Sequence, residues 1–517
     1  MSFRKLILCA AIAVPLCAGT AAAPRELLLR IQQVIQQGDL AAARNQLKAA
    51  LGEFPAEPVL HNLLGVVEAQ QGNRQAAEAN FKKALEHAPD FTGALMNLAR
   101  LYQEKAAADP KALGQALDAY QKVLKYEGGN VEALYQSAFL LVRTGAYQAS
   151  LDHLNRLPAA AQERAQALAV RCADEAALGR ASPAADTAER LLKSPDLSEE
   201  DVVAALSQVQ AHDEKLAVRM LEGLVERRLA SGVGLARLGW LYRRQGQLAP
   251  ARETLERAAQ AAGPSAGLLT ELARVAYQQR DHEGALGYLG HARDLEPRNA
   301  GIHFFFGMVC VELNLPIDAR KSLEEAVRLD PENAYYNYAL GAVAVHGRPG
   351  ESIPYFEKYI ARKPDDPRGR FALGAAQFYA GNYEEAQKDL RSVAAKPETA
   401  AGAHYFLGRI AKLQQDLPEA ERELTQAIAA NPKFADALAE LGHVHIRTER
   451  YEEAAKTLER ARALDPDNFR VNANLLILYQ KTKDPRAEAQ QQRFEEIKKK
   501  RAADEELLWR SIEVRPY

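Results

Sequence analysis

A period of 34 residues runs through this chain from the end of an apolar N-terminal segment almost to the last residue. Its clearest copy carries the residues that recur in the others: Pro58, Leu64, Gly65, Ala77, Phe81, Ala84 and Pro89. A period of this length corresponds to one supersecondary unit, whose apolar face can be buried only by the neighbouring copies. We therefore expect a stack of repeats with one continuous core, where 517 residues would otherwise suggest about three globular domains.

Each recurring residue has a physical reason. A glycine inside a helix is less favourable than alanine by about 1 kcal/mol, so Gly65 is expected where two helices approach closely. Ala77 is small for the same reason, and Phe81 fills the space that remains between the helices. Pro89 ends the second helix, because proline lacks an amide hydrogen and disfavours helix in the preceding residue. The pattern thus predicts a pair of packed helices in every unit.

This pattern resembles the tetratricopeptide repeat, a helix-turn-helix of 34 residues with Leu-Gly, Ala, an aromatic residue and Pro at these offsets. The glycine returns at five later places: Gly239, Gly307, Gly374, Gly408 and Gly442. The resemblance implies an all-α fold, a right-handed superhelical α-solenoid of about fourteen helix pairs. The pairs are expected to begin near residues 24, 58, 92, 131, 165, 198, 232, 266, 300, 334, 367, 401, 435 and 469.

The predicted organisation has four parts. Residues 1–23 form a signal peptide, 24–231 an N-terminal array, 232–483 a C-terminal array, and 484–517 a charged capping helix and tail. The pair from 92 holds about five extra residues, which predicts a longer turn between its helices. The pairs from 165 and 198 lack the glycine and the aromatic residue. They are therefore either degenerate repeats or a flexible, differently curved joint.

The first 23 residues have the three regions of a secretory signal peptide. Arg4 and Lys5 are positively charged, residues 6–18 are apolar, and residues 19–23 are small. The apolar run is shorter than the roughly 20 residues of a membrane helix, and an uncleaved anchor is the alternative. We expect a periplasmic or secreted protein of a bacterial cell envelope, with no integral membrane span after cleavage.

Charge and cysteine content exclude two further classes. With 66 basic and 68 acidic residues the net charge is −2, which gives no reason to expect nucleic acid as a partner. Of the four cysteines, only Cys172 and Cys310 lie outside the signal peptide, at helical positions. We interpret both as small core residues and not as a disulfide or a metal pair.

No enzyme motif is present in the sequence. H-E-x-x-H, the phosphate-binding loop, G-x-G-x-x-G and G-x-S-x-G are all missing. His443 and His445 are two residues apart and so point to different sides of a helix, whereas helical metal ligands stand three or four apart. We therefore expect no catalytic residue, no metal and no cofactor.

The family resemblance also implies which residues would bind a ligand. In tetratricopeptide proteins the first helix of each pair lines a concave groove, at places two, five, six, nine, twelve and thirteen of the unit. Aromatic and arginine side chains dominate binding hot spots, and these places collect both here. The predicted protein-binding groove consists of Arg237, Trp240, Arg243, Arg244, Arg274, Tyr277, Phe305, Met308, Tyr335, Tyr338, Phe378, Tyr379, Phe406, Arg409 and Lys412.

Burial in the core is the alternative for many of these rings. It applies above all to the aromatic residues that share place five: Phe304, Tyr338, Phe371 and Tyr405. If the groove prediction holds, apolar side chains of a peptide would lie between rings, with an acidic group on Arg274 or Arg409.

The predicted function is therefore a non-enzymatic protein-protein interaction scaffold or adaptor. Some relatives clamp a C-terminal carboxylate with an asparagine at place nine, but that place holds Val66, Arg100, Trp240, Arg274 and Arg409. An alternative is a component of an exopolysaccharide or cellulose biosynthesis and export machine, whose aromatic groove contacts glycan. The protein or peptide partner is not identified by the sequence.

Overall fold

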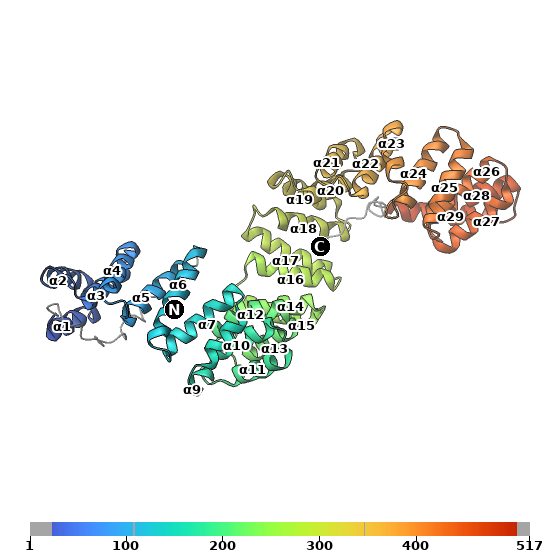
Figure 1. Cartoon of the computed structure of the whole chain (residues 1–517). Helices are drawn as coiled ribbons and strands as arrows, with labels where there is room; N and C mark the ends of the chain where they lie inside the picture. Colours follow the sequence, from blue (N-terminus) through green and yellow to red (C-terminus); the bar gives the residue numbers. More distant parts are fainter. Residues whose placement is uncertain (1–22, 107–108, 346, 504–517) are drawn as a thin grey trace. The chain divides into compact units, whose positions relative to one another are not determined.

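The computed structural model of the protein describes residues 23–106, 109–345 and 347–503, with side chains up to residue 499. Within these ranges the chain forms 29 α-helices and no strand, which confirms the all-α solenoid. Within each of the two units described below, the helices lie side by side as antiparallel pairs, and each pair packs on the next (Figure 1). Residues 1–22 of the predicted signal peptide (1–23) and residues 504–517 of the predicted tail lie outside the described residues.

The chain divides into two compact units between Ala262 and Gly263, one helix pair after the predicted division at 231/232. Unit 1 contains α1 Arg25–Gln36, α2 Leu40–Glu53, α3 Pro58–Gln70, α4 Arg74–His87, α5 Thr92–Lys105, α6 Pro110–Tyr126, α7 Val131–Thr144, α8 Tyr147–Asn155, α9 Ala159–Gln162, α10 Ala165–Ala177, α11 Ala181–Lys193, α12 Glu199–His212, α13 Glu214–Glu226, α14 Gly232–Arg244 and α15 Leu248–Ala262. Unit 2 contains α16 Ala266–Gln278, α17 His282–Leu295, α18 Ala300–Glu312, α19 Pro316–Leu329, α20 Ala334–Ala344, α21 Pro349–Arg362, α22 Pro367–Ala380, α23 Tyr383–Val393, α24 Ala400–Leu413, α25 Leu417–Ala430, α26 Ala435–Arg447, α27 Tyr451–Leu464, α28 Phe469–Thr482 and α29 Ala487–Ala503.

The first helix of every pair begins within one residue of its predicted start. Most of the second helices end two residues before a proline. For example, α4 ends at His87, two residues before Pro89, and α25 ends at Ala430, two residues before Pro432. The 34-residue period therefore corresponds to the helix pairs in the structure.

Close packing explains the recurring glycine. A Cβ atom on Gly408 would lie 2.7 Å from Cγ of Leu424 and 3.3 Å from the carbonyl oxygen of Ala420, both on α25. On Gly65 it would lie 2.5 Å from the ring of Phe81. Real Cβ atoms do not approach carbon this closely, so a larger residue would force the two helices apart.

Three segments depart from the regular pattern. The prediction that the extra residues of the pair from 92 form a longer turn is wrong. Helix α6 has 17 residues against 14 in α4, so most of the insertion lengthens the second helix. The degenerate stretch 165–231 still forms helix pairs, in which α10 packs on both α11 and α12 and also touches α8. The short helix α9 precedes it and was not predicted from the sequence.

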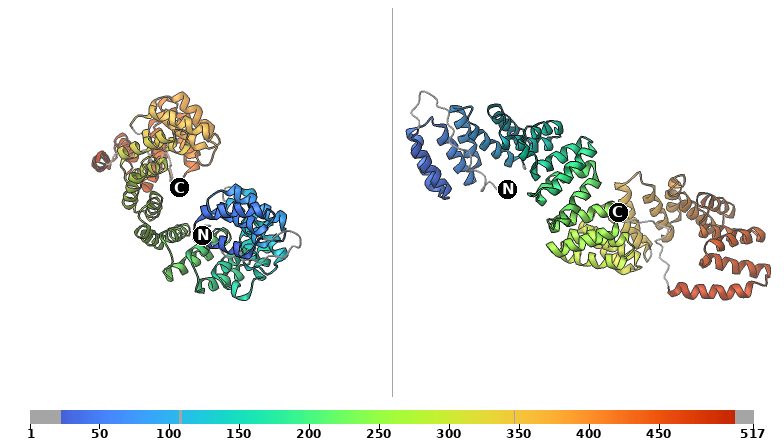
Figure 2. Two further views of the ribbon diagram at one scale, coloured as in Figure 1. Left: turned by 90° about the vertical axis from the view of Figure 1, so that its left-hand side faces the viewer. Right: turned by 90° about the horizontal axis from the view of Figure 1, so that it is seen from below.

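The last helix, α29, packs against α28 (Figure 2). The ring of Phe494 lies 5.0 Å from that of Phe469, and the side-chain amide of Gln490 donates to the backbone oxygen of Asn472 at 3.1 Å. No helix in the described part of the chain combines the length and the apolar character needed to cross a membrane. Cys172 and Cys310 are both buried free thiols, as the sequence predicts.

Candidate functional site

The fifteen predicted groove residues divide by exposure. Ten are at least partly exposed, namely Arg237, Trp240, Arg243, Arg244, Arg274, Tyr277, Tyr335, Tyr379, Arg409 and Lys412. Five are buried: Phe305, Met308, Tyr338, Phe378 and Phe406. The prediction that these five line an open surface is therefore wrong, because rings and side chains of adjacent first helices pack on one another. The rings at place five, Phe304, Tyr338, Phe371 and Tyr405, are buried as well, which selects the core alternative for them.

Four of the predicted residues gather on α14 in unit 1. The guanidinium of Arg244 lies 4.9 Å from the ring centroid of Trp240 and 3.3 Å from a carboxylate oxygen of Glu214. Arg237 donates to the side chain of Gln210 at 3.0 Å. These basic side chains are thus held by neighbours on α12 and α13.

In unit 2, α16 and α18 bring Arg274, Tyr277 and Phe305 together. Arg274 lies 5.4 Å above the buried ring of Phe305, and Tyr277 meets the same ring edge-on at 5.8 Å. The Tyr277 hydroxyl donates to Glu312 at 3.0 Å. Burial and the nearby Glu312 carboxylate raise the pKa of Tyr277, so this hydroxyl stays protonated and remains a donor.

A second group of rings lies on α20 and α21. Tyr335 is 36% exposed, whereas Tyr338 is buried against Tyr359 with 4.8 Å between ring centroids. The ammonium of Lys363 lies 5.4 Å from the ring centroid of Tyr335. Tyr335 thus presents an exposed aromatic face beside a positive charge.

The densest cluster surrounds Arg409 on α24, and we call it the Arg409 cluster. It consists of Phe378 and Tyr379 on α22, Tyr405, Phe406, Arg409 and Lys412 on α24, Asp436 and Glu440 on α26, and Arg470 on α28. The guanidinium carbon of Arg409 lies 4.5 Å from the ring centroid of Phe378, 5.5 Å from that of Tyr405, and 6.0 Å from those of Tyr379 and Phe406. At such distances the ring faces attract the cation.

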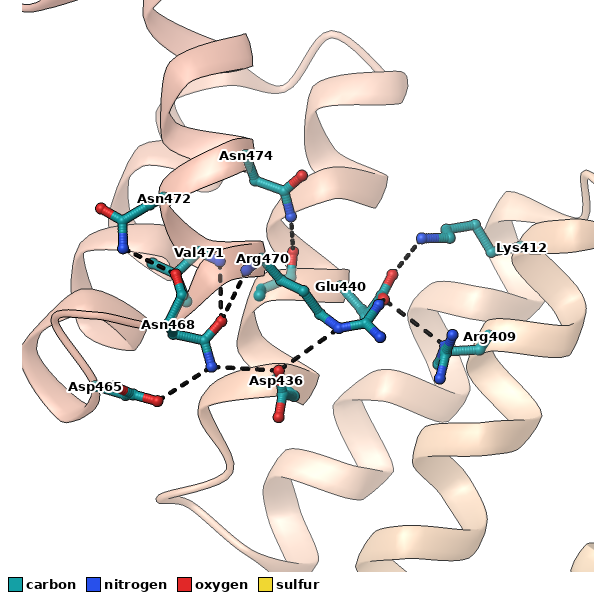
Figure 3. A network of polar contacts seen from close by, with 11 residues as sticks. Arg409, Lys412, Asp436, Glu440, Asp465, Asn468, Arg470, Val471, Asn472 and Asn474 are labelled. Carbon is teal, nitrogen blue, oxygen red and sulfur yellow. Dashed lines mark hydrogen bonds and ion pairs between the residues drawn. The ribbon is translucent and has the colours of Figure 1, made fainter. Parts of the chain in front are cut away.

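Glu440 is the buried anion of this cluster, with 3% of its surface exposed. Arg470 donates to Glu440 Oε1 at 2.8 Å, and Lys412 donates to Oε2 (Figure 3). Burial by itself raises the pKa of Glu440, but the charges of Lys412, Arg470 and Arg409 outweigh it and hold the pKa below its usual range. Glu440 is therefore ionised and fixes the cations around it.

Positive charge exceeds negative charge in the Arg409 cluster. Arg409, Lys412 and Arg470 face two carboxylates, those of Glu440 and Asp436, and Asp436 lies 3.7 Å from Arg470 (Figure 3). Lys412 and Arg470 are 19% and 39% exposed, so part of this charge reaches solvent. The arrangement suits an anionic group more than a cationic one.

Sequence reasoning missed Asp436, Glu440 and Arg470. They occupy places two and six of the pairs from 435 and 469, which are among the places read for the groove. The signal was therefore present in the sequence, because the same places of earlier pairs supply the predicted groove residues. The buried charge of Glu440 also needs partners from two other helices, which no single unit reveals.

His445, and His404 one helix pair earlier, each lie beside a carboxylate. His404 Nδ1 lies 2.6 Å from Glu423, and His445 Nε2 lies 3.5 Å from Glu421. Burial and the nearby Lys412 lower the pKa of His443. In the ranges that the structure describes, no group of three or more His, Cys, Asp or Glu side chains is arranged to hold a metal ion.

Unit 1 also holds a cavity of about 260 Å³ that the sequence did not indicate. Its walls come from α7, α10 and α12 and include Tyr135, Phe139, Val170, Ala173 and Ala205. Ala173 stands at place nine of its pair, where other pairs carry Trp240, Met308 or Arg409. The small Ala173 side chain leaves this space open, so no large residue at place nine marks it in the sequence.

The packed helix pairs define an α-solenoid repeat protein. Models of the tetratricopeptide repeat match residues 29–90, 236–300, 311–367, 371–423 and 411–485, which together make up more than half of the chain. The chain belongs to the tetratricopeptide repeat family.

Two curated relatives share segments of the sequence. Cellulose synthase operon protein C of Xanthomonas axonopodis pv. citri is 28% identical over 197 residues, 24% of this chain and 13% of that protein. A DnaJ homolog subfamily C member 7 homolog of Dictyostelium discoideum is 23% identical over 195 residues, 34% of this chain and 36% of that protein. The chain thus spans 13% and 36% of the lengths of these relatives.

Solved structures resemble the chain at low identity. A chain of the Naa15/Naa10 complex bound to HypK-THB is 16% identical with a TM-score of 0.37, covering 90% of this chain and 94% of that one. A chain of the APC/C hetero-tetramer Cut9-Hcn1 is 14% identical with a TM-score of 0.40, covering 88% and 96%. PilW, a type IV pilus biogenesis factor, is 22% identical with a TM-score of 0.36, covering 41% and 98%.

Proposed function

We propose that this protein is a non-enzymatic scaffold or adaptor, and that it binds a segment of a partner protein along the first helices of unit 2. The observation that carries the proposal is the Arg409 cluster, where partly exposed Tyr379 and Arg409 pack on the buried rings of Phe378 and Phe406 and partly exposed Lys412 pairs with Glu440. A rigid aromatic floor beneath charged and aromatic groups is the usual composition of a binding hot spot.

Membership of the tetratricopeptide repeat family supports the same proposal, because repeat solenoids present extended surfaces for binding. Exposed Tyr335 lies on α20, and Lys363 follows the end of α21. Both would extend the contact along unit 2. Arg4, Lys5 and the apolar residues that follow them support export, so we place the partner in a bacterial periplasm or outside the cell.

A crosslinking pull-down from an envelope extract of the source organism tests this proposal. The baits are the unaltered protein, a Tyr379→Ala/Lys412→Ala variant, and a matched control, Lys388→Ala/Lys396→Ala, which removes exposed lysines from α23 and the turn that follows it. We expect the unaltered protein and the control to capture the same partner and the cluster variant to lose it. Equal capture by all three baits would show that the partner does not bind the first helices of unit 2.

A role in exopolysaccharide or cellulose export is the second candidate. It is favoured by the 28% identity to a cellulose synthase operon protein and by the exposed face of Tyr335, since aromatic rings could stack on sugars. Calorimetric titration with soluble cello-oligosaccharides separates the two candidates. Saturable binding that Tyr335→Ala and Tyr379→Ala abolish would support the glycan function.

A further inference from the structure

Arg409 is a largely buried cation without a hydrogen bond. Its side chain is 16% exposed, and four rings surround it. Within the described ranges no group accepts a hydrogen bond from it: Glu440 Oε1 lies 3.8 Å from Nε, and Nη1 is buried without a partner. A guanidinium carries five N–H donors, and buried donors in folded proteins are normally satisfied. The donors of Arg409 therefore need a hydrogen-bond acceptor that the described part of the chain does not supply.

The neighbouring side chains hold Arg409 in a fixed orientation. Phe378 lies 4.5 Å beneath the guanidinium, and Tyr405 lies 5.5 Å away. Glu440, on the next first helix, attracts Arg409 but forms its short contacts with Lys412 and Arg470 instead (Figure 3). An incoming acceptor would meet a guanidinium that has already lost its conformational freedom, which lowers the entropy cost of binding.

We infer that the partner segment docks a carboxylate on Arg409 and Lys412, with a large apolar side chain of the same segment against Tyr379. This inference rests on the proposed function and names the chemistry of its ligand. Carboxylate oxygens match the planar fork of a guanidinium and accept two parallel N–H bonds from it. The excess of positive charge over Glu440 and Asp436 favours the same ligand.

A selection from random dodecapeptides displayed on phage, with the purified protein as target, tests the inference. We expect selected peptides to carry Asp or Glu next to an aromatic or large aliphatic residue. Replacement of that acid by its amide should weaken binding about 10- to 100-fold in fluorescence polarisation, the usual loss for one hydrogen bond to a charged group. Peptides with free and amidated C-termini distinguish a terminal carboxylate from a side-chain carboxylate.

Two substitutions in the protein complete the test. Arg409→Lys keeps the charge and removes the planar fork, so we expect a loss of the same size, with the fold checked by circular dichroism. Lys412→Gln serves if Arg409→Lys does not fold, because glutamine keeps an N–H donor for Glu440 while it removes the charge.

The outcomes separate the inference from the proposed function. In one outcome, the selected peptides lack acidic residues and still fail to bind the Tyr379→Ala variant. That result would overturn the inference that a carboxylate docks on Arg409 and would leave the proposed binding function standing. Equal affinity of the acid and amide peptides would overturn it as well. If no peptide were enriched over the helper phage, both the proposed function and the inference would fail.

Discussion

The guanidinium of Arg409 lies 4.5 Å from the ring centroid of Phe378, on the buried side of α22. Phe378 and Phe406 were both predicted as groove residues, yet each serves as the floor on which Arg409 rests. The surface available to a partner is therefore smaller and more charged than the aromatic groove that the sequence predicts. The consequences can be measured one residue at a time.

Glu440→Gln should destabilise unit 2 and strengthen binding of an acidic ligand. Removal of a buried anion leaves Arg409, Lys412 and Arg470 facing one another, and breaking a buried ion pair costs about 3–5 kcal/mol. Because Arg470 is 39% exposed, water offsets part of this loss, and we expect about 1–3 kcal/mol. Urea unfolding followed by circular dichroism measures it, with exposed Glu385→Gln as the control. An unchanged midpoint would show that Glu440 does not organise the cluster.

Gly408→Ala and Gly287→Ala should have opposite effects on stability. A Cβ at 408 would lie 2.7 Å from Leu424, and overpacking of this kind costs about 1–3 kcal/mol. A Cβ at 287, in the middle of α17, meets no atom within 4 Å, so alanine there should stabilise the helix by up to about 1 kcal/mol. Thermal melting of both variants provides the comparison. Equal melting temperatures would contradict the packing role of the glycine.

Tyr338→Ala should destabilise the protein far more than Tyr335→Ala. Tyr338 is 7% exposed and packs on Phe356 and Tyr359, so its loss should cost about 3–5 kcal/mol. Tyr335 is 36% exposed, and we expect less than about 1 kcal/mol. Unfolding in urea distinguishes the two. A large loss for Tyr335→Ala would make that ring part of the core and remove it from the binding surface.

Stability should fall as the pH rises, because of Asp174 in unit 1. Its side chain is fully buried and burial raises its pKa to about 7, which the nearby Ser150 hydroxyl and Arg171 offset only in part and Glu175 reinforces. Neither carboxylate oxygen accepts a hydrogen bond, because the Ser150 hydroxyl donates to the backbone oxygen of Ala138 instead. The folded state thus binds this proton more tightly than the unfolded chain, whose aspartates titrate near 4. The free energy of unfolding should decrease between about pH 4 and pH 7, by up to about 4 kcal/mol, and be constant above.

Asp174→Asn tests this assignment, because the amide cannot titrate. The difference in unfolding free energy between pH 5 and pH 8 should shrink in the variant, and the variant should be the more stable protein at pH 8. The matched control is Asp152→Asn, an exposed carboxylate on α8. An unchanged pH dependence in Asp174→Asn would assign the effect to other groups.

The helix pairs could be predicted because their determinants lie within one unit. Gly408, Ala420 and Leu424 stand at fixed offsets, and the same contact recurs at Gly239, Gly307 and Gly374. The binding surface could be predicted only in part. Tyr379 is partly exposed and Phe378 is buried, although they are neighbours in the sequence, because Phe378 is covered by Arg409 as well as by the rings of Phe406 and Tyr383. Such coverage depends on three-dimensional neighbours and leaves no trace in a single unit.

The local packing of the helices has a mechanical consequence. Within each unit every helix packs mainly on helices that adjoin it in the sequence, so each tertiary contact closes a short loop and little entropy is lost in forming it. Folding can start at any well-packed pair and spread along the chain, and low contact order favours fast rates. Within each unit, a pulling force would therefore separate neighbouring helices one contact at a time. We expect the protein to yield by detaching one helix pair after another and to recoil when the load is released.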